Sequence, residues 1–71
     1  MRWQTAAQKV ARNIKMQRHI KGLTQQQAAE RSGRLSLRYW QYLERGDKNF
    51  RIETLVLVAK ALDVDIRDLF S

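Results

Sequence analysis

The sequence predicts an all-α fold, and three observations support this prediction. Gly22, Gly33 and Gly46 divide the chain into four segments, and no proline interrupts any of them. Apolar residues recur at three- and four-residue spacings in the first and last segments, as on one face of a helix. Thr24 and Gln27 form the T-x-x-Q pattern of a capping box, which marks the start of a helix.

The first segment, from about Thr5 to Ile20, is predicted to be an amphipathic helix packed against a core. Its apolar stripe consists of Ala7, Val10, Ala11 and Ile14. Basic residues occupy the other faces of this helix, so binding at a membrane surface is an alternative. The stripe is mostly alanine and therefore too thin for insertion into a membrane. We expect no membrane partner.

The central segments predict two short helices joined by a tight turn. Thr24 caps the first helix, which extends to Ser32 and ends at Gly33. Ser36 is the expected N-cap of the second helix, which runs to Arg45 and stops at Gly46.

The second of these helices has two different faces. At about 100° per residue, Trp40 and Leu43 lie side by side and are expected to pack, with Tyr39 at their edge. The opposite face carries Leu37, Arg38, Gln41, Tyr42 and Arg45. An ordinary surface helix also has a polar outer face. However, Arg and Gln can pair with guanine and adenine edges, and Leu or Tyr can contact a thymine methyl group.

The last segment is predicted to supply the other half of the core. The apolar positions are Ile52, Leu55, Val58, Ala59 and Leu62, followed by Val64, Ile66, Leu69 and Phe70. Asp65 is the expected N-cap before Ile66. Val56 and Leu57 fall off the stripe, so they are either scattered exposed residues or a dimer contact.

Three stretches together resemble the phage repressor and Cro family of helix-turn-helix regulators (XRE-like). They are LTQQQAAERSG, LSLRYWQYLERG and NFRIETLVLVAKALDVDIRDLF. The resemblance covers about Val10 to Phe70. It implies a five-helix repressor-like bundle, in which Thr24 to Ser32 form the positioning helix and Ser36 to Arg45 the recognition helix.

The resemblance also implies a partly buried ion pair between Arg18 and Glu44, which would fix the orientation of the recognition helix. Two independent surface charges are the alternative. The chain departs from the family pattern in its turn, where Gly33-Arg34-Leu35-Ser36 carries one extra residue. Gln17 stands where the family often has Leu. Phe50 stands where it often has Pro, and can pack or contact a partner.

Composition limits the remaining possibilities. With 71 residues the chain forms one domain, residues 1–71, of modest stability, and it has no cysteine for a disulfide or thiolate site. Residues 1–51 hold twelve Lys and Arg against three acidic residues, a net charge of +9, while residues 52–71 carry −2. This division suits one face turned towards a polyanion. A generally basic protein is the alternative.

Nothing in the sequence predicts an enzyme. His19 is the only histidine, and no nucleophilic set can be assembled around it. Asp63, Asp65 and Asp68 lack the Gly and closing Glu of a calcium loop. No glycine-rich phosphate loop is present. We therefore expect no catalytic residues, no cofactor and no metal. No signal peptide or transmembrane stretch is evident, which predicts a cytoplasmic protein.

The expected function is sequence-specific binding of double-stranded DNA by a homodimeric transcriptional regulator on an inverted-repeat operator. Gln25 and Gln26 are expected to contact phosphate or an adjacent base. Leu37, Arg38, Gln41 and Tyr42 should face the bases, next to the cap Ser36. The phosphate candidates are Arg34, Tyr39, Arg45, Lys48, Asn49 and Arg51, of which Tyr39 could equally belong to the core. The expected dimer interface contains Val56, Leu57 and Phe70.

Size makes a small controller protein of a restriction-modification system, or a Cro-type repressor, the favoured member of this family. The alternative is an antitoxin-like protein-interaction module, with a toxin as its main partner and DNA binding as a secondary property. Such antitoxins usually carry an extra segment for the toxin. Only Met1 to Gln8 would be available for that purpose.

Overall fold

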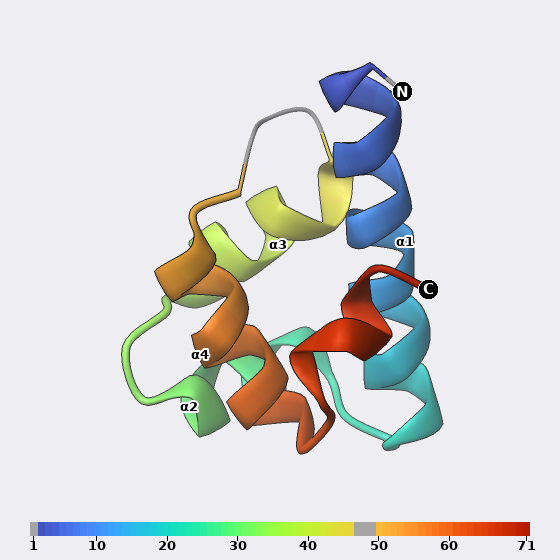
Figure 1. The fold of residues 1–71 in the computed structure, drawn as a ribbon. Coiled ribbons are helices and arrows are strands. Elements are labelled where there is room, and N and C mark those ends of the chain that lie inside the picture. Colours follow the sequence, from blue (N-terminus) through green and yellow to red (C-terminus); the bar gives the residue numbers. More distant parts are fainter. Residues whose placement is uncertain (1, 47–49) are drawn as a thin grey trace.

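The computed structural model describes residues 2–46 and 50–71, and these residues form four α-helices and one short 3-10 helix (Figure 1). The elements are α1 (Trp3–Ile20), α2 (Gln25–Ser32), α3 (Leu37–Arg45), α4 (Ile52–Leu62) and η1 (Ile66–Leu69). The all-α prediction is confirmed. The fifth helix of the expected bundle is a four-residue 3-10 helix.

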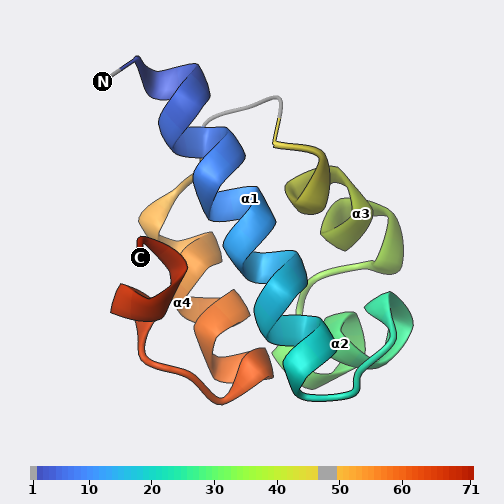
Figure 2. The same cartoon turned by 90° about the vertical axis from the view of Figure 1, so that its right-hand side faces the viewer.

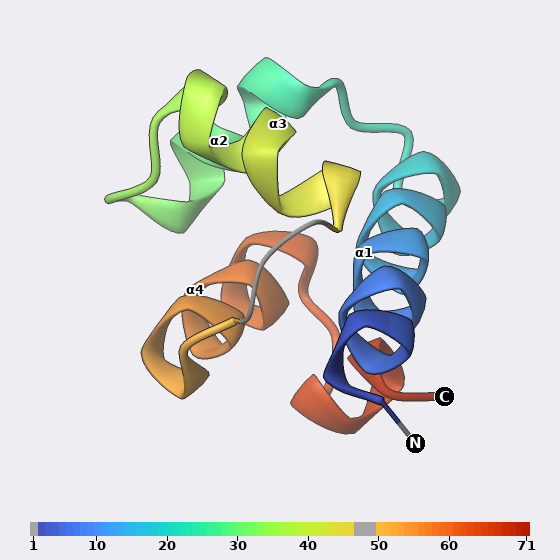
Figure 3. The same cartoon turned by 90° about the horizontal axis from the view of Figure 1, so that it is seen from above.

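The helices surround one core. The long helix α1 packs against α3, α4 and η1, and Figure 2 shows it in front, with α3 on one side and α4 on the other. Helix α2 packs against both α3 and α4. In Figure 3, α2 and α3 lie side by side at the top of the view, with α1 and α4 beside and below them.

The helix ends are set by the side chains and glycines that the sequence indicated. The Thr24 hydroxyl accepts a hydrogen bond from the Gln27 backbone N–H at 3.0 Å, and the Gln27 side chain accepts one from the Thr24 N–H at 2.9 Å. The Ser36 hydroxyl caps α3. Gly33 and Gly46 end α2 and α3 in the left-handed region, which glycine enters without steric cost.

The core contains the predicted stripe of α1, because Ala7, Val10, Ala11 and Ile14 are all buried. Helix α4 contributes Leu55, Val58, Ala59 and Leu62, and η1 contributes Leu69. Val64 and Ile66 are half-buried and pack against this cluster.

Two residues predicted to belong to the core do not. Ile52 is 60% exposed and Phe70 is 51% exposed. Ile52 is the first residue of α4 and Phe70 follows η1, so both lie where a helix ends and no described element covers them. They line one end of the core without being enclosed by it.

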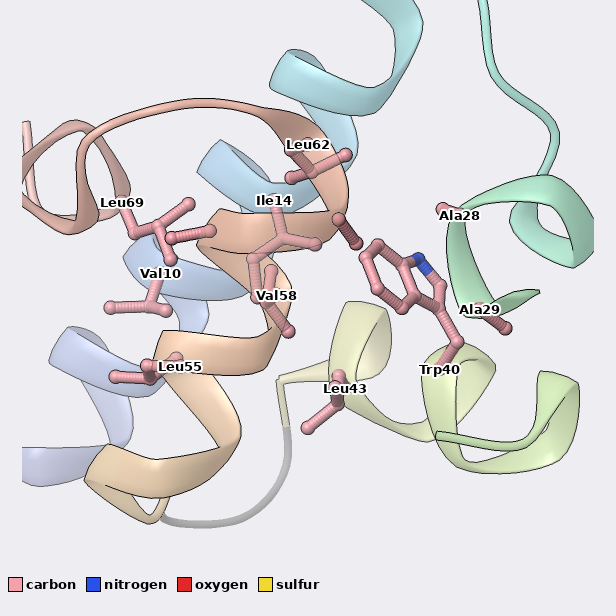
Figure 4. Packing of buried hydrophobic residues seen from close by; sticks show 12 residues of the cluster. Val10, Ile14, Ala28, Ala29, Trp40, Leu43, Leu55, Val58, Leu62 and Leu69 are labelled. Atoms are coloured by element: carbon pink, nitrogen blue, oxygen red, sulfur yellow. The ribbon is translucent and has the colours of Figure 1, made fainter. Parts of the chain in front are cut away.

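Trp40 fixes α3 to the rest of the molecule. Its indole is fully buried and lies between Ala28 and Ala29 of α2 on one side and the aliphatic cluster on the other (Figure 4). The two alanines leave room for the ring, so α3 approaches α2 closely. Loss of such a buried aromatic side chain usually costs about 3 to 5 kcal/mol.

The carboxyl-terminal residues are held to α1 by Asn13, which the sequence did not single out. The buried Asn13 amide donates to the backbone oxygens of Leu69 at 3.0 Å and Ser71 at 2.9 Å. Asp65 caps η1, as predicted. Among the described residues, no helix combines the length and apolarity that a membrane span requires.

Candidate nucleic-acid interface

The turn between α2 and α3 is organised around Ser32. Its buried hydroxyl donates to the Ala29 backbone oxygen at 2.6 Å and accepts from the backbone N–H groups of Leu35 at 2.9 Å and Arg34 at 3.3 Å. These bonds hold the turn that contains the extra residue. Sequence reasoning missed Ser32, although a serine directly before the glycine that ends a helix is a signal for such a contact.

Gly46 sets how closely the end of α3 approaches α1. A Cβ atom at this position would lie 2.9 Å from the Cβ of Ala11, and φ is +71°. The sequence marked Gly46 only as the end of a helix. The structure adds a second reason for glycine, because any side chain would push α3 away from α1.

The outer face of α3 carries the residues that the helical spacing assigned to it. Arg38, Gln41 and Arg45 are exposed, whereas Leu37 and Tyr42 are half-buried. Arg38, Gln41, Tyr42 and Arg45 line one shared depression. The Arg45 guanidinium carbon lies 5.0 Å from the centre of the Tyr42 ring, which holds both side chains on this face.

Tyr39 lies at the edge of this face and is 39% exposed. Its ring meets that of Tyr42 edge to face, with centroids 6.4 Å apart. Tyr39 therefore belongs to the surface rather than to the core. Trp40 and Leu43 on the opposite face are buried, as predicted.

Several of the phosphate candidates are exposed. Arg34 in the turn and Arg51 before α4 are exposed, as is Gln26 in the first turn of α2. The hydroxyl of Ser36 is occupied in capping α3. Lys48 and Asn49 lie outside the described residues.

Arg18 and Glu44 form the ion pair that the resemblance implied. The Arg18 Nε atom donates to Glu44 Oε2 at 2.7 Å and Nη2 donates to Oε1 at 3.0 Å, while Nη1 donates to the backbone oxygen of Leu23 at 2.9 Å. The two side chains are only 9% and 5% exposed. Two further donors reach the carboxylate: Trp40 Nε1 at 2.6 Å and Gln25 Nε2 at 3.1 Å.

The pKa of Glu44 is lowered from its ordinary value. Burial opposes ionisation, but the hydrogen bonds from Arg18, Trp40 and Gln25 and the charge of Arg18 outweigh it. The Glu44 carboxylate is therefore ionised in the folded chain at neutral pH. It joins α1, α2 and α3 at one point.

This shift predicts a pH dependence of stability. Because the folded pKa lies below the ordinary 4.5, the contribution of Glu44 is complete above pH 4.5 and is lost as the pH falls through the lowered folded value. Asp65 also has a lowered pKa, caused by Arg67. Chemical unfolding of the wild type and of Glu44→Gln from pH 3 to pH 7 separates the contribution of Glu44 from that of other groups. We expect the difference in free energy of unfolding between the two proteins to shrink towards pH 3. A difference that does not change with pH would contradict a lowered pKa of Glu44.

Gln25, the first residue of α2, also contacts the outer face of α3. Its Oε1 atom accepts a long hydrogen bond of 3.4 Å from Gln41 Nε2. Gln25 was expected to contact phosphate or an adjacent base. Within the chain, its amide bonds both Glu44 and Gln41. Gln26, its neighbour, is exposed.

The residues expected at a dimer interface lie in the carboxyl-terminal part of the chain, outside α2 and α3. Val56 is 53% exposed and Leu57 is half-buried. Phe70 borders an open apolar pocket of about 270 Å³ whose lining combines α1, α4 and the residues that flank α4 and η1. The lining residues are Ala6, Ala7, Val10, Phe50, Ile52, Leu55 and Phe70. Of the two roles left open for Phe50, packing is observed, since it is partly buried against the core.

Comparisons with known proteins agree with this architecture. A family model described as helix-turn-helix matches residues 14–69. The control protein C.SmaI of Serratia marcescens is 37% identical over 62 residues, which cover 87% of this chain and 73% of that protein.

Solved structures also resemble the chain closely. The restriction-modification controller protein C.AhdI from Aeromonas hydrophila superposes with a TM-score of 0.89 at 31% identity, covering 99% of this chain and all of that one. The clp gene regulator ClgR from C. glutamicum gives a TM-score of 0.82 at 33% identity, covering 90% of this chain and 82% of that one. The match of the family model over most of the chain, together with the identity to C.SmaI, shows that the chain belongs to the XRE type of helix-turn-helix family, whose members are DNA-binding transcription regulators and not enzymes.

Proposed function

We propose that this protein binds an inverted-repeat operator in double-stranded DNA as a homodimer and thereby controls transcription. The observation that carries the proposal is the outer face of α3, where Arg38, Gln41 and Arg45 are exposed. Gln41 also contacts Gln25, the first residue of α2. The opposite face of α3 is anchored by a buried tryptophan. A helix held in this way can enter the major groove with its polar face forward.

The side chains proposed to contact DNA divide by chemistry into three groups. Arg38 and Gln41 lie on the outward face and can form paired hydrogen bonds with guanine and adenine edges, respectively. Leu37 and Tyr42 offer apolar contact to thymine methyl groups. Arg34, Arg51 and Gln26 are exposed and are our candidates for contacts with phosphates. The charge of +9 on residues 1–51 supports the same assignment.

We further propose that the regulated genes belong to a restriction-modification system. The support is the similarity to C.SmaI, which is called a control protein, and to C.AhdI, which is called a restriction-modification controller protein. A transcription regulator acts where the DNA is, so we place the protein in the cytoplasm.

The dimer is proposed from geometry and from the size of the readout. One copy presents only two turns and a half of recognition helix, which reaches a few base pairs. Two copies related by a two-fold axis would place their recognition helices about 34 Å apart, in successive major grooves on one side of the duplex. The exposed Val56 and Phe70 provide apolar surface for the contact.

Selection of binding sites from random duplex DNA tests this proposal. We expect the wild type to enrich an inverted repeat, and Arg38→Ala to lose stringency at one base pair in each half, since a good base contact discriminates by about 1 to 3 kcal/mol. Arg12→Ala is the matched control, because Arg12 is an exposed arginine on α1. It should return the wild-type motif. Failure of the wild type to enrich any motif would refute the proposal.

A further inference from the structure

The turn between α2 and α3 contains the extra residue of this chain, and the buried hydroxyl of Ser32 holds the turn in place. The hydroxyl donates to the Ala29 backbone oxygen and accepts from the backbone N–H groups of Leu35 at 2.9 Å and Arg34 at 3.3 Å. One oxygen atom thus ties the last turn of α2 to the two residues that precede the cap of α3. Ser32 is only 1% exposed, so its side chain offers no surface to DNA.

From Trp40 onwards, α3 is fixed independently of this turn. Trp40 is fully buried in the core, and the Arg18 guanidinium holds the Glu44 carboxylate through bonds of 2.7 Å and 3.0 Å. Directly after the helix, Gly46 approaches α1 so closely that an added Cβ atom would lie 2.9 Å from the Cβ of Ala11. These contacts attach the carboxyl-terminal part of α3 firmly to the rest of the molecule.

The amino end of α3 depends more on the turn. Leu35 and Leu37 are half-buried, and Arg38, the second residue of the helix, is exposed. The Ser36 hydroxyl bonds a backbone N–H of α3 itself, so this cap would move with the helix. The Ser32 hydroxyl supplies hydrogen bonds that relate the start of α3 to α2.

Without the Ser32 hydroxyl, α3 can pivot about its fixed part. The two N–H groups of the turn lose their acceptor, so the turn gains access to other conformations. When a helix rotates about a fixed part, side chains outside that part are displaced more than side chains within it. Arg38 lies before the fixed part, whereas Gln41 lies between Trp40 and Glu44. Arg38 should therefore be displaced more than Gln41.

We infer that Ser32 is a positioning residue that sets the start of α3 and, with it, the base contact of Arg38. The inference rests on the proposed operator binding and adds to it a residue that shapes specificity from inside the protein. It makes the effect depend on the position along α3. The base pair that Arg38 reads should be affected, and the base pair that Gln41 reads should not.

Selection of binding sites followed by titration tests the inference. Arg38→Ala and Gln41→Ala locate the two base pairs, and Ser32→Ala is used alone and combined with Arg38→Ala. Each protein is titrated against the selected operator and against operators changed at one of the two base pairs. The measured quantity is the ratio of affinities between operators, which a smaller folded fraction leaves unchanged. Ile14→Val is the control, because it removes one methylene group from a fully buried site on α1.

The expected results follow from the energies of single contacts. Ser32→Ala should lower the preference at the base pair of Arg38 by about 2-fold to 10-fold, the equivalent of one hydrogen bond. The preference at the base pair of Gln41 should change by less than about 2-fold. Ser32→Ala should add nothing at the first base pair when Arg38 is already alanine. Ile14→Val lowers stability by the loss of a core contact and should leave both preferences intact.

Hydrogen exchange provides a second measurement, which does not depend on DNA. Ser32→Ala should speed the exchange of the Leu35 backbone amide by a larger factor than that of the Leu43 amide, because only Leu35 loses its acceptor. Ile14→Val should not single out Leu35. If Ser32→Ala does not fold, Ser32→Cys takes its place, since a thiol is a weaker acceptor than a hydroxyl. The same pattern is then expected with smaller effects.

Four outcomes would overturn the inference. They are an unchanged preference at the base pair of Arg38, a loss at the base pair of Gln41 that is as large or larger, additive effects in the double variant, and exchange of the Leu35 amide that rises no more than that of Leu43. Each of them leaves operator binding itself standing, because the wild type would still select a motif. If the wild type selected none, the proposed function would fail as well.

Discussion

Replacing Glu44 with alanine should lower the free energy of unfolding by about 3 to 5 kcal/mol, the usual cost of breaking a buried ion pair by removing one partner. The variant leaves the Arg18 guanidinium nearly buried without its counter-ion, and it removes the acceptor of Trp40 Nε1. Small domains are stable by only about 5 to 15 kcal/mol. Urea denaturation followed by circular dichroism should show a transition at much lower urea than in the wild type.

Two controls separate the ion pair from the loss of a glutamate as such. Glu30→Ala removes an exposed glutamate of α2 and should change stability by no more than about 0.5 kcal/mol. The double variant Arg18→Met with Glu44→Gln removes both charges but keeps an acceptor for the tryptophan. It should be more stable than Glu44→Ala. A Glu44→Ala variant as stable as Glu30→Ala would show that the network contributes little.

The parts of the fold that could be predicted from the sequence are those fixed within one turn of chain. Thr24, Ser36 and Asp65 cap helices because a capping side chain needs only a backbone N–H two or three residues away. The two faces of α3 follow from the helical repeat alone. For this reason the spacing of residues along α3 was enough to predict the burial of Trp40 and the exposure of Arg38.

The parts that could not be predicted depend on distances between segments far apart in the chain. Asn13 reaches Leu69, and Gln25 reaches Glu44, only after the helices have packed. The pair of Arg18 and Glu44 was expected from the family resemblance, since no local spacing links residues in two different helices. Ile52 was misplaced for a related reason. Its spacing fits the apolar stripe, but the stripe extends past the end of the elements that cover it.

The second large effect is expected at Val56, an exposed apolar residue of α4 that is proposed for the dimer interface. Val56→Glu should weaken both dimerisation and operator binding by at least tenfold, because the proposed contact would bury an unpaired carboxylate. Val56 is 53% exposed, so the substitution should leave the monomer folded. Leu57, the other residue of α4 proposed for the interface, is half-buried, and a charge there would also disturb the monomer.

Ile20→Glu is the matched control for Val56→Glu. Ile20 is 67% exposed at the carboxyl end of α1, whereas the apolar pocket involves the first half of that helix. The two variants replace an exposed aliphatic residue by the same charge, so the change in net charge is equal in both. Sedimentation of each protein, with one operator titrated against each, compares assembly and binding directly. If the wild type stays monomeric at high concentration and on DNA, the dimer is excluded. If Val56→Glu dimerises and binds the operator as well as Ile20→Glu does, the two-fold contact must use a surface other than the one around Val56. An unpaired carboxylate buried in the interface would weaken dimerisation measurably.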